Sequence, residues 1–307
     1  MTDYAPSLIE RAAARLRQPV SSRPETAAGI ESPLASSVRT QPPFKPVHHG
    51  QDRTEAAAPL SGDRGIRTVT ISPISLAANG IVSPSENSSR TAQEFRAIKR
   101  EVFANIRRSN GAKNRIVVVT SAKSGEGKTY TATNLALAFA YEQDTRVLLV
   151  DGDAYRHSML DYLGLSADKG WLDVITDAAP LSGVVLRTNL SNLELLPAGK
   201  ERSGIPELMS SGRMTALLEQ LQSEDRSRVI IIDSVPCLTS TEPAILSELA
   251  GQTLLIVAAD DTPRDDIEAS LRLLKASASV NLVLNKTHPL LTEQFKGYSY
   301  NYALREN

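Results

Sequence analysis

Two adjacent side chains, Lys128 and Thr129, have neighbours that suit them for phosphate chemistry. They end the glycine-containing stretch 121–129, which follows the β-branched run 115–120 and precedes the Ala- and Leu-rich segment 130–141. A strand, a glycine loop and a helix in this order can wrap phosphates with backbone N–H groups at a helix N-terminus. Lys128 would reach the β- and γ-phosphates of a nucleotide, and the Thr129 hydroxyl would bind Mg²⁺.

The residues expected to bind the nucleotide are Ser124, Gly125, Glu126, Gly127, Lys128, Thr129, Tyr130 and Asn285. Ala122 stands where such loops usually begin with glycine, so the interpretation depends on the flanking segments as well as on Gly-Lys-Thr. Asn285 closes the last apolar run together with Lys286. It could hydrogen-bond to the base edge of the nucleotide or belong to a simple turn.

Three aspartates that follow apolar runs could complete the site. Asp151 and Asp153 come directly after the run 147–150, and residues two apart in an extended segment point the same way. A cation would relieve the repulsion of the two carboxylates; one could hold Mg²⁺ and the other could accept a proton from an attacking hydroxyl. Asp233 ends the run 229–232, a pattern typical of the carboxylate that orients Mg²⁺ water in phosphate-loop NTPases. The expected catalytic residues are Lys128, Asp151, Asp153 and Asp233, and the expected metal ligands are Thr129, Asp151, Asp153 and Asp233.

The elements that would position these side chains alternate along the chain from residue 113. Short continuous apolar runs occupy 147–150, 229–232, 253–259 and 280–284, and amphipathic segments occupy 213–222, 241–249 and 264–276. The pattern predicts an α/β fold with a doubly wound, mostly parallel sheet and helices on both faces. A further short strand is expected over 193–199. Ligands of such sheets bind at the C-terminal ends of the strands.

Bulk composition limits the class of protein. The 307 residues carry a net charge of −1, which favours neither a nucleic-acid nor a strongly acidic partner. Cys237 is the only cysteine, so an internal disulfide is impossible and a reducing compartment fits. No apolar run approaches the roughly 20 residues of a membrane span. We therefore expect a cytoplasmic protein whose membrane association depends on a partner.

Four parts are expected along the chain. Residues 1–17 predict a short amphipathic helix, and 18–89 a Pro- and Ser-rich linker that is mostly disordered. The nucleotide-binding domain is expected over 90–290, starting with a basic amphipathic helix at 90–108. Residues 291–307 form a C-terminal tyrosine tail.

The tail carries Tyr298, Tyr300 and Tyr302, separated by polar residues. An edge strand would explain the alternation, and an aromatic tail ordered on a partner would explain the aromatic content. A mobile tail with accessible hydroxyls would explain both the position and the polarity, and its tyrosines would then be phosphoacceptors.

Taken together, these residues resemble the bacterial tyrosine kinases, which are similar to the MinD/ParA branch of phosphate-loop ATPases. The resemblance covers roughly 90–302 and rests on the loop 121–129, the acidic motifs at 147–156 and 229–236, and the terminal tyrosines. Segments near the N-terminus are similar to those of the exosortase-associated tyrosine autokinases of exopolysaccharide loci.

The resemblance implies an ATP- and Mg²⁺-dependent tyrosine autokinase that regulates exopolysaccharide synthesis or export. It implies a homo-oligomeric ring in which the tail of one subunit enters its neighbour's site, and a membrane-embedded polysaccharide chain-length protein as the activator. On this resemblance Tyr298, Tyr300 and Tyr302 accept phosphate. Arg96 and Lys99 are assigned to the ring interface, and Arg156 to the interface or the support of the site.

Two rival functions share the fold. Lys123 occupies the place of the signature lysine of MinD/ParA ATPases, so a positioning ATPase that uses water as acceptor is one alternative. A nucleotide-gated scaffold with weak catalysis is the other, because the chain departs from the kinase pattern. The departures are Gln93, Ser124, His157 and Val235.

Overall fold

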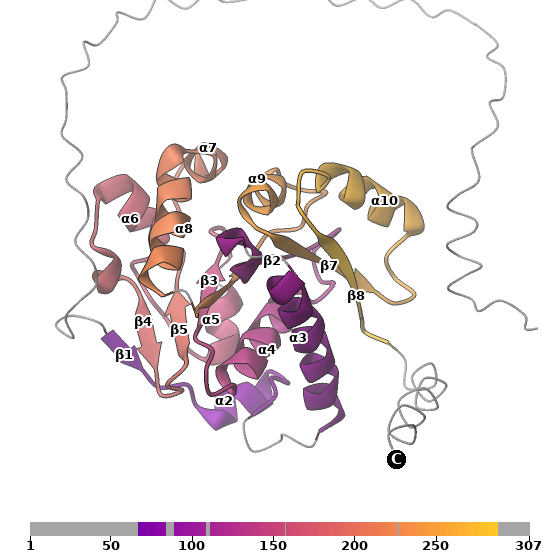
Figure 1. The fold of residues 1–307 in the computed structure, drawn as a ribbon, viewed down its shortest axis with the longest axis horizontal. Helices are drawn as coiled ribbons and strands as arrows, with labels where there is room; N and C mark the ends of the chain where they lie inside the picture. The colour runs from indigo at the N-terminus through magenta and orange to yellow at the C-terminus, as the bar shows by residue number, and fades with distance from the viewer. Residues whose placement is uncertain (1–66, 84–88, 109–110, 157, 226, 288–307) are drawn as a thin grey trace, which may run out of the picture. The chain divides into compact units, whose positions relative to one another are not determined.

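The computed structural model describes residues 67–83, 89–108, 111–156, 158–225 and 227–287. In these ranges the chain forms an eight-stranded, mostly parallel sheet between two layers of helices (Figure 1). This arrangement confirms the predicted fold class. Within the same ranges, no helix has the length and apolar composition that crossing a membrane requires.

The strand that precedes the phosphate loop in the sequence lies inside the sheet, with a neighbouring strand on each side. In spatial order the strands are β1 (Arg67–Val69), β4 (Leu186–Thr188), β5 (Leu193–Leu196), β3 (Val147–Asp151), β6 (Val229–Asp233), β2 (Ile116–Ser121), β7 (Gln252–Ala258) and β8 (Val280–Asn285). Neighbouring strands pair in parallel except β4 and β5, which pair antiparallel. The C-terminal ends of β2, β3 and β6 therefore meet at one edge, where ligands of such sheets bind.

Two helix layers cover the sheet. One layer contains α2 (Pro73–Ala78), α3 (Arg90–Arg108), α4 (Lys128–Ala140) and α5 (Ser158–Leu163). The other contains α6 (Trp171–Asp177), α7 (Ile205–Met209), α8 (Gly212–Glu224), α9 (Glu242–Leu249) and α10 (Arg264–Leu273). Short 3₁₀ turns lie at Ala112–Arg115 and Leu181–Gly183.

The alternation of side chains along each strand builds a core on both faces. On β2, Val117 and Val119 pack with α3, α4 and α5, whereas Ile116 and Val118 pack with the helices of the opposite layer. Every residue of β2, β3 and β6 is buried. This double burial is the physical reason why these strands read as continuous apolar runs.

Residues 67–83, which we call the N-terminal strap, correct the predicted domain boundary. The expected linker 18–89 includes them, yet they form β1 and α2 and belong to the nucleotide-binding domain. Ile71, Leu76 and Ile81 are 2%, 2% and 1% exposed. The expected domain 90–290 therefore starts too late, because these apolar residues fill the core beside α4 and α5.

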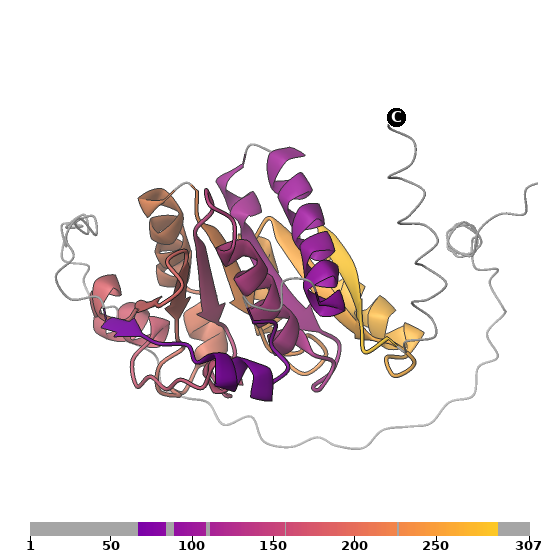
Figure 2. The same ribbon diagram turned by 90° about the horizontal axis from the view of Figure 1, so that it is seen from below.

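The ribbon of the N-terminal strap, in indigo, runs along the described domain (Figure 2). Asparagine side chains fasten it there: Asn189 accepts from the Ile71 backbone N–H at 2.9 Å and donates to the Ile71 carbonyl at 3.3 Å. Asn134 of α4 accepts from the Val82 N–H at 2.8 Å and donates to the Tyr130 carbonyl at 3.0 Å. The strap is thus joined through Asn134 to the first turn of α4, the turn that begins at Lys128.

The predicted helix 90–108 matches α3, and the short strand expected over 193–199 appears as β5. Residues 1–66 and 288–307 lie outside the described ranges, and so do the expected helix 1–17 and the tyrosine tail 291–307.

Candidate nucleotide-binding site

The phosphate loop joins β2 to α4 in the conformation that its glycines permit. Gly125 and Gly127 have φ values of 88° and 95°, in the left-handed region that favours glycine. Gly127 precedes the first residue of α4, and its carbonyl accepts from the Thr131 N–H at 2.9 Å. The loop is therefore placed at a helix N-terminus, where backbone donors and the helix dipole favour an anion.

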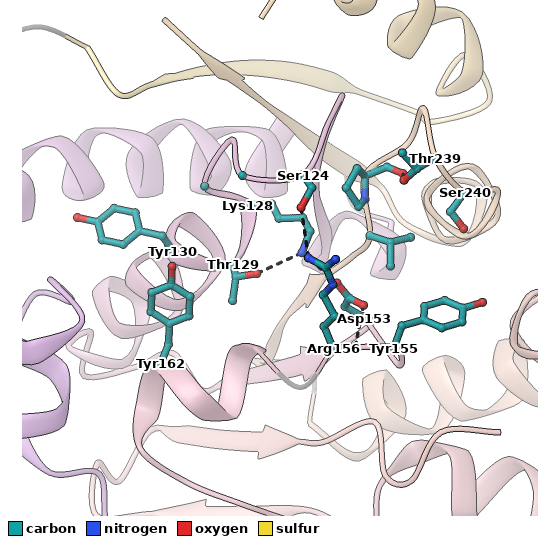
Figure 3. A pocket seen from close by; sticks show the side chains of 14 residues that line it. Ser124, Lys128, Thr129, Tyr130, Asp153, Tyr155, Arg156, Tyr162, Thr239 and Ser240 are labelled. Atoms are coloured by element: carbon teal, nitrogen blue, oxygen red, sulfur yellow. Dashed lines mark hydrogen bonds and ion pairs between the residues drawn. The ribbon is translucent and has the colours of Figure 1, made fainter. Parts of the chain in front are cut away.

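Lys128 lies at the centre of the polar contacts in the pocket (Figure 3). Its ammonium group donates to Asp153 Oδ2 and to Thr129 Oγ1, both at 3.2 Å, and lies 3.9 Å from Asp233 Oδ1. Only 11% of the Lys128 side chain is exposed. The ammonium therefore lies between two carboxylates beside the loop, where an incoming phosphate would meet it.

Asp151 and Asp233 are register partners at the C-terminal ends of the adjacent strands β3 and β6. The Gly152 N–H donates to the Asp233 carbonyl at 2.7 Å, and a Cβ at Gly152 would lie 2.7 Å from that oxygen. The Trp171 indole N–H donates to the Asp151 carbonyl at 2.7 Å. These contacts explain the glycine between the two aspartates, and they fix the strand ends from which the carboxylates project.

Burial raises the pKa of Asp233 to about 7, with Asp151 and Asp153 adding to the rise and Lys128 opposing it. The side chain of Asp233 is completely buried. A group whose folded pKa exceeds its unfolded value of 3.8 contributes stability that is fully present below about pH 4. This contribution is lost as the pH rises through about 7.

Replacing Asp233 by asparagine should therefore flatten the pH dependence of stability in the protein without metal or nucleotide. Between pH 4 and pH 8 the wild type should lose stability relative to Asp233→Asn, by an amount on the order of 4 kcal/mol at most. Chemical denaturation in EDTA at several pH values measures this difference. A constant difference in stability across the range would contradict the expectation.

The residues present fit a magnesium ion held together with phosphates. No three His, Cys, Asp or Glu side chains of the described ranges are arranged to hold a metal ion unaided. However, the carboxylate of Asp233 is completely buried behind the loop, with the Thr129 hydroxyl and the Lys128 ammonium as polar neighbours. Mg²⁺ commonly takes one or two protein oxygens and completes its shell with substrate phosphates and water. Thr129 and one or more of the three aspartates would hold it.

The pocket at this site has a volume of about 650 Å³. From the expected set it is lined by Ser124, Gly125, Gly127, Lys128, Thr129, Tyr130 and Asp153. It is also lined by Tyr155, Arg156, Tyr162, Val235, Pro236, Thr239 and Ser240, most of which the sequence analysis does not assign. Tyr155 and Arg156 lie within the acidic motif 147–156, and this position in the sequence could have identified them. Tyr162, Thr239 and Ser240 come near the loop only through the fold (Figure 3).

Four residues that were expected to bind the nucleotide or the metal are not part of the pocket lining. Glu126, Asp151, Asp233 and Asn285 do not line the pocket. Asn285 donates from Nδ2 to the Glu126 carbonyl at 2.8 Å, so its side chain is directed at the loop backbone. In this arrangement Asn285 braces the phosphate loop.

The basic residues assigned to the ring interface make contacts within the chain. Lys99 pairs with Glu142 and donates to the Ala138 carbonyl at 3.3 Å, and its side chain is 11% exposed. Arg96 is half-buried on α3. Arg156 is exposed and donates to Ser124 Oγ at 3.5 Å, which places its guanidinium over the phosphate loop. Tyr298, Tyr300 and Tyr302 lie outside the described residues.

The fold and the loop define a phosphate-loop nucleotide-binding protein, and comparisons with known proteins agree. A family model described as an AAA domain matches residues 114–263. The VpsO kinase domain superposes with a TM-score of 0.57 and 25% identity, covering 67% of this chain and all of that domain.

Two curated relatives specify the family. The tyrosine-protein kinase CpsD of Streptococcus pneumoniae serotype 4 is 31% identical over 181 residues, which cover 58% of this chain and 78% of CpsD. The tyrosine-protein kinase ptk of Acinetobacter johnsonii is 30% identical over 178 residues, but the match spans only 24% of its length. The chain belongs to the bacterial tyrosine-protein kinase family.

Proposed function

We propose that the chain is an ATP-dependent tyrosine autokinase that phosphorylates the C-terminal tyrosines of a neighbouring subunit. The observation that carries this proposal is the position of the Lys128 ammonium beside the phosphate loop. It lies 3.2 Å from Asp153 Oδ2 and 3.9 Å from Asp233 Oδ1. Lys128 would bind oxygens of the β- and γ-phosphates and stabilise the charge that develops on the transferred group.

The chemical step is a phosphoryl transfer from ATP to a tyrosine hydroxyl. The phenolic oxygen forms a bond to the γ-phosphorus, the bond from that phosphorus to the β,γ-bridging oxygen breaks, and ADP leaves. The phenolic proton passes to a carboxylate, and Asp153 suits this role because it lines the pocket next to Lys128. Mg²⁺, when bound, neutralises charge on the β- and γ-phosphates.

Arg156 and the pocket beyond Lys128 support an acceptor that enters from outside. The guanidinium lies over Ser124 and is exposed, so it can meet the transferring phosphoryl group or an incoming chain. The tyrosines Tyr155 and Tyr162 also line the pocket. A pocket of about 650 Å³ leaves room for an acceptor side chain beside the phosphates.

Lys123 argues against the positioning ATPase. Its ammonium pairs with Asp266 Oδ2 of α10 in the same chain at 2.5 Å. In this arrangement the Lys123 ammonium is directed at α10 of its own chain, and a nucleotide in a second subunit would have to break this exposed ion pair. The pairing therefore favours the kinase over an ATPase that uses this lysine across a dimer.

We further propose that the protein acts as a homo-oligomer at the inner face of the bacterial inner membrane. A membrane-embedded polysaccharide chain-length protein would hold it there and activate it, and the reaction would regulate exopolysaccharide synthesis or export. The family of the chain supports this assignment, and Arg96, Lys99 and Arg156 are the proposed interface residues.

Incubation with Mg·ATP should add phosphate to Tyr298, Tyr300 or Tyr302, because the family resemblance assigns the phosphoacceptor role to this tyrosine cluster. Intact-mass and peptide mass spectrometry detect the modification. A mixture of Lys128→Met protein and protein ending at residue 290 tests transfer between subunits, since only the first has the three C-terminal tyrosines and only the second has Lys128. Phosphotyrosine on the Lys128→Met chain supports the proposal. ATP turnover without any phosphotyrosine would favour the positioning ATPase.

A further inference from the structure

Glu126 is a buried carboxylate within the phosphate loop itself. Its side chain is 3% exposed, and the residue does not line the pocket. A negative charge beside a site for a triphosphate is electrostatically unfavourable, so its presence calls for a compensating role. The proposed nucleotide chemistry does not use this carboxylate.

Both oxygens of the Glu126 carboxylate accept hydrogen bonds that shape the loop. Oε2 accepts from the Lys123 backbone N–H at 2.7 Å, which closes the turn from 123 to 126. Oε1 accepts from the hydroxyl of Thr262, in the segment between β7 and α10. That hydroxyl in turn accepts from the Ala258 N–H at 2.9 Å, at the last residue of β7. The loop is therefore tied to the neighbouring strand end through one carboxylate.

Two further contacts join the loop to the same side of the sheet. The Lys123 ammonium pairs with Asp266 in the first turn of α10. Asn285, at the end of β8, donates to the Glu126 carbonyl at 2.8 Å. The amide of Asn285 lies where a Cβ at Gly127 would come within 2.1 Å, so the packing is tight. Glu126 is the residue at which the strand ends of β7 and β8 both meet the loop.

We propose that Glu126 is a positioning residue that holds the phosphate loop in its binding shape before the nucleotide arrives. Convergent backbone N–H groups repel one another while no anion is bound, so an unsupported loop would populate other conformations. A nucleotide binds only the competent fraction, and its apparent dissociation constant rises as that fraction falls. The proposal rests on the nucleotide site of the proposed function and does not depend on the tyrosine acceptor.

The proposal has a kinetic signature that a lost ligand contact would not give. Glu126→Ala should slow the association of a fluorescent ADP analogue about tenfold and leave its dissociation rate within about twofold, because fewer molecules have a competent loop. Thr262→Val should give a smaller effect of the same kind. The double variant should be close to Glu126→Ala, because the Thr262 hydroxyl contacts the loop through the Glu126 carboxylate.

Stopped-flow mixing with Mg²⁺ and the ADP analogue measures both rates on the full-length protein. Glu126→Gln keeps a single acceptor oxygen and should recover part of the association rate. Glu268→Ala is the matched control, since that carboxylate lies on α10 and its hydrogen bond is to Arg264. Titration with inorganic pyrophosphate should show the same fold-loss as ADP, because the effect concerns phosphate binding.

The outcomes separate this proposal from the proposed function. If the wild type binds neither ADP nor pyrophosphate, the nucleotide site itself is wrong. If the wild type binds and Glu126→Ala keeps the wild-type association rate, the role of Glu126 is overturned. A faster dissociation with unchanged association would also overturn it. Circular dichroism at the assay temperature confirms that each variant is folded, so a loss of stability alone cannot produce the expected result.

Discussion

Lys128→Met should lower autophosphorylation by about 100- to 1,000-fold, the usual effect of removing one donor that stabilises transition-state charge. The substitution deletes the ammonium group that lies between Asp153 and Asp233 and leaves both carboxylates without it. Methionine has a similar length and no charge, so the change tests the ammonium group itself. Quantitative phosphotyrosine mass spectrometry at saturating Mg·ATP is the measurement.

Two controls make this result specific. Lys275→Met removes an exposed lysine and should label at the wild-type rate. Lys128→Arg keeps a positive charge with a different shape, and we expect it to recover only a small part of the activity. Undiminished labelling of a folded Lys128→Met protein would show that the phosphate site has been misplaced.

Leu76→Ala should destabilise the domain by about 2–5 kcal/mol, the usual cost of truncating a buried leucine. Leu76 lies in α2 of the N-terminal strap and is 2% exposed. Ile74, in the same helix, is 81% exposed, so Ile74→Ala should change the free energy of unfolding by about 0.5 kcal/mol or less. Denaturant unfolding of the two variants measures the difference.

The same reasoning predicts the fate of a chain that begins at residue 90. Such a chain lacks Ile71, Leu76 and Ile81, each of which contributes about 1.5–3 kcal/mol through burial. Because a domain is stable by only about 5–15 kcal/mol, it should fold poorly or aggregate. A chain beginning at residue 67 should fold. Equal stability of the two chains would refute the assignment of the N-terminal strap to the domain.

The strands around the site could be predicted because a strand that is buried on both faces has an unbroken run of apolar residues. The runs at 147–150 and 229–232 are apolar without a break, and each ends in an aspartate that the structure places at the same edge of the sheet. The position of Lys128 followed from the glycines before it. The placement of polar side chains at strand ends can thus be predicted from the sequence when both the strand and its polar end are local features.

The N-terminal strap could not be predicted because its buried residues have no regular period. Ile71, Leu76 and Ile81 are five residues apart, a spacing that fits neither a strand nor a helix face. Much of the segment is irregular backbone, and distant asparagines such as Asn134 and Asn189 satisfy its polar groups. Those partners are 52 and 118 residues away, so no local pattern reveals them.

Several residues that line the pocket could not be predicted from the sequence either. Tyr162 of α5 and Thr239 follow different strands and approach the phosphate loop only after the sheet has formed. The direction of Asn285 is also a tertiary property, because its amide lies against Gly127 and the Glu126 carbonyl. Its expected contact with a nucleotide base depended on the strand end alone, without knowledge of that packing.

The order of the strands has a practical consequence for experiments on the whole chain. β1 and β8 are the two outermost strands, on opposite sides of the sheet. Polypeptide that precedes residue 67 and polypeptide that follows residue 287 therefore attach to the domain at opposite flanks. An affinity tag or a surface tether fused ahead of β1 should leave the tyrosine-bearing end free to react, so immobilised kinase can be assayed in place.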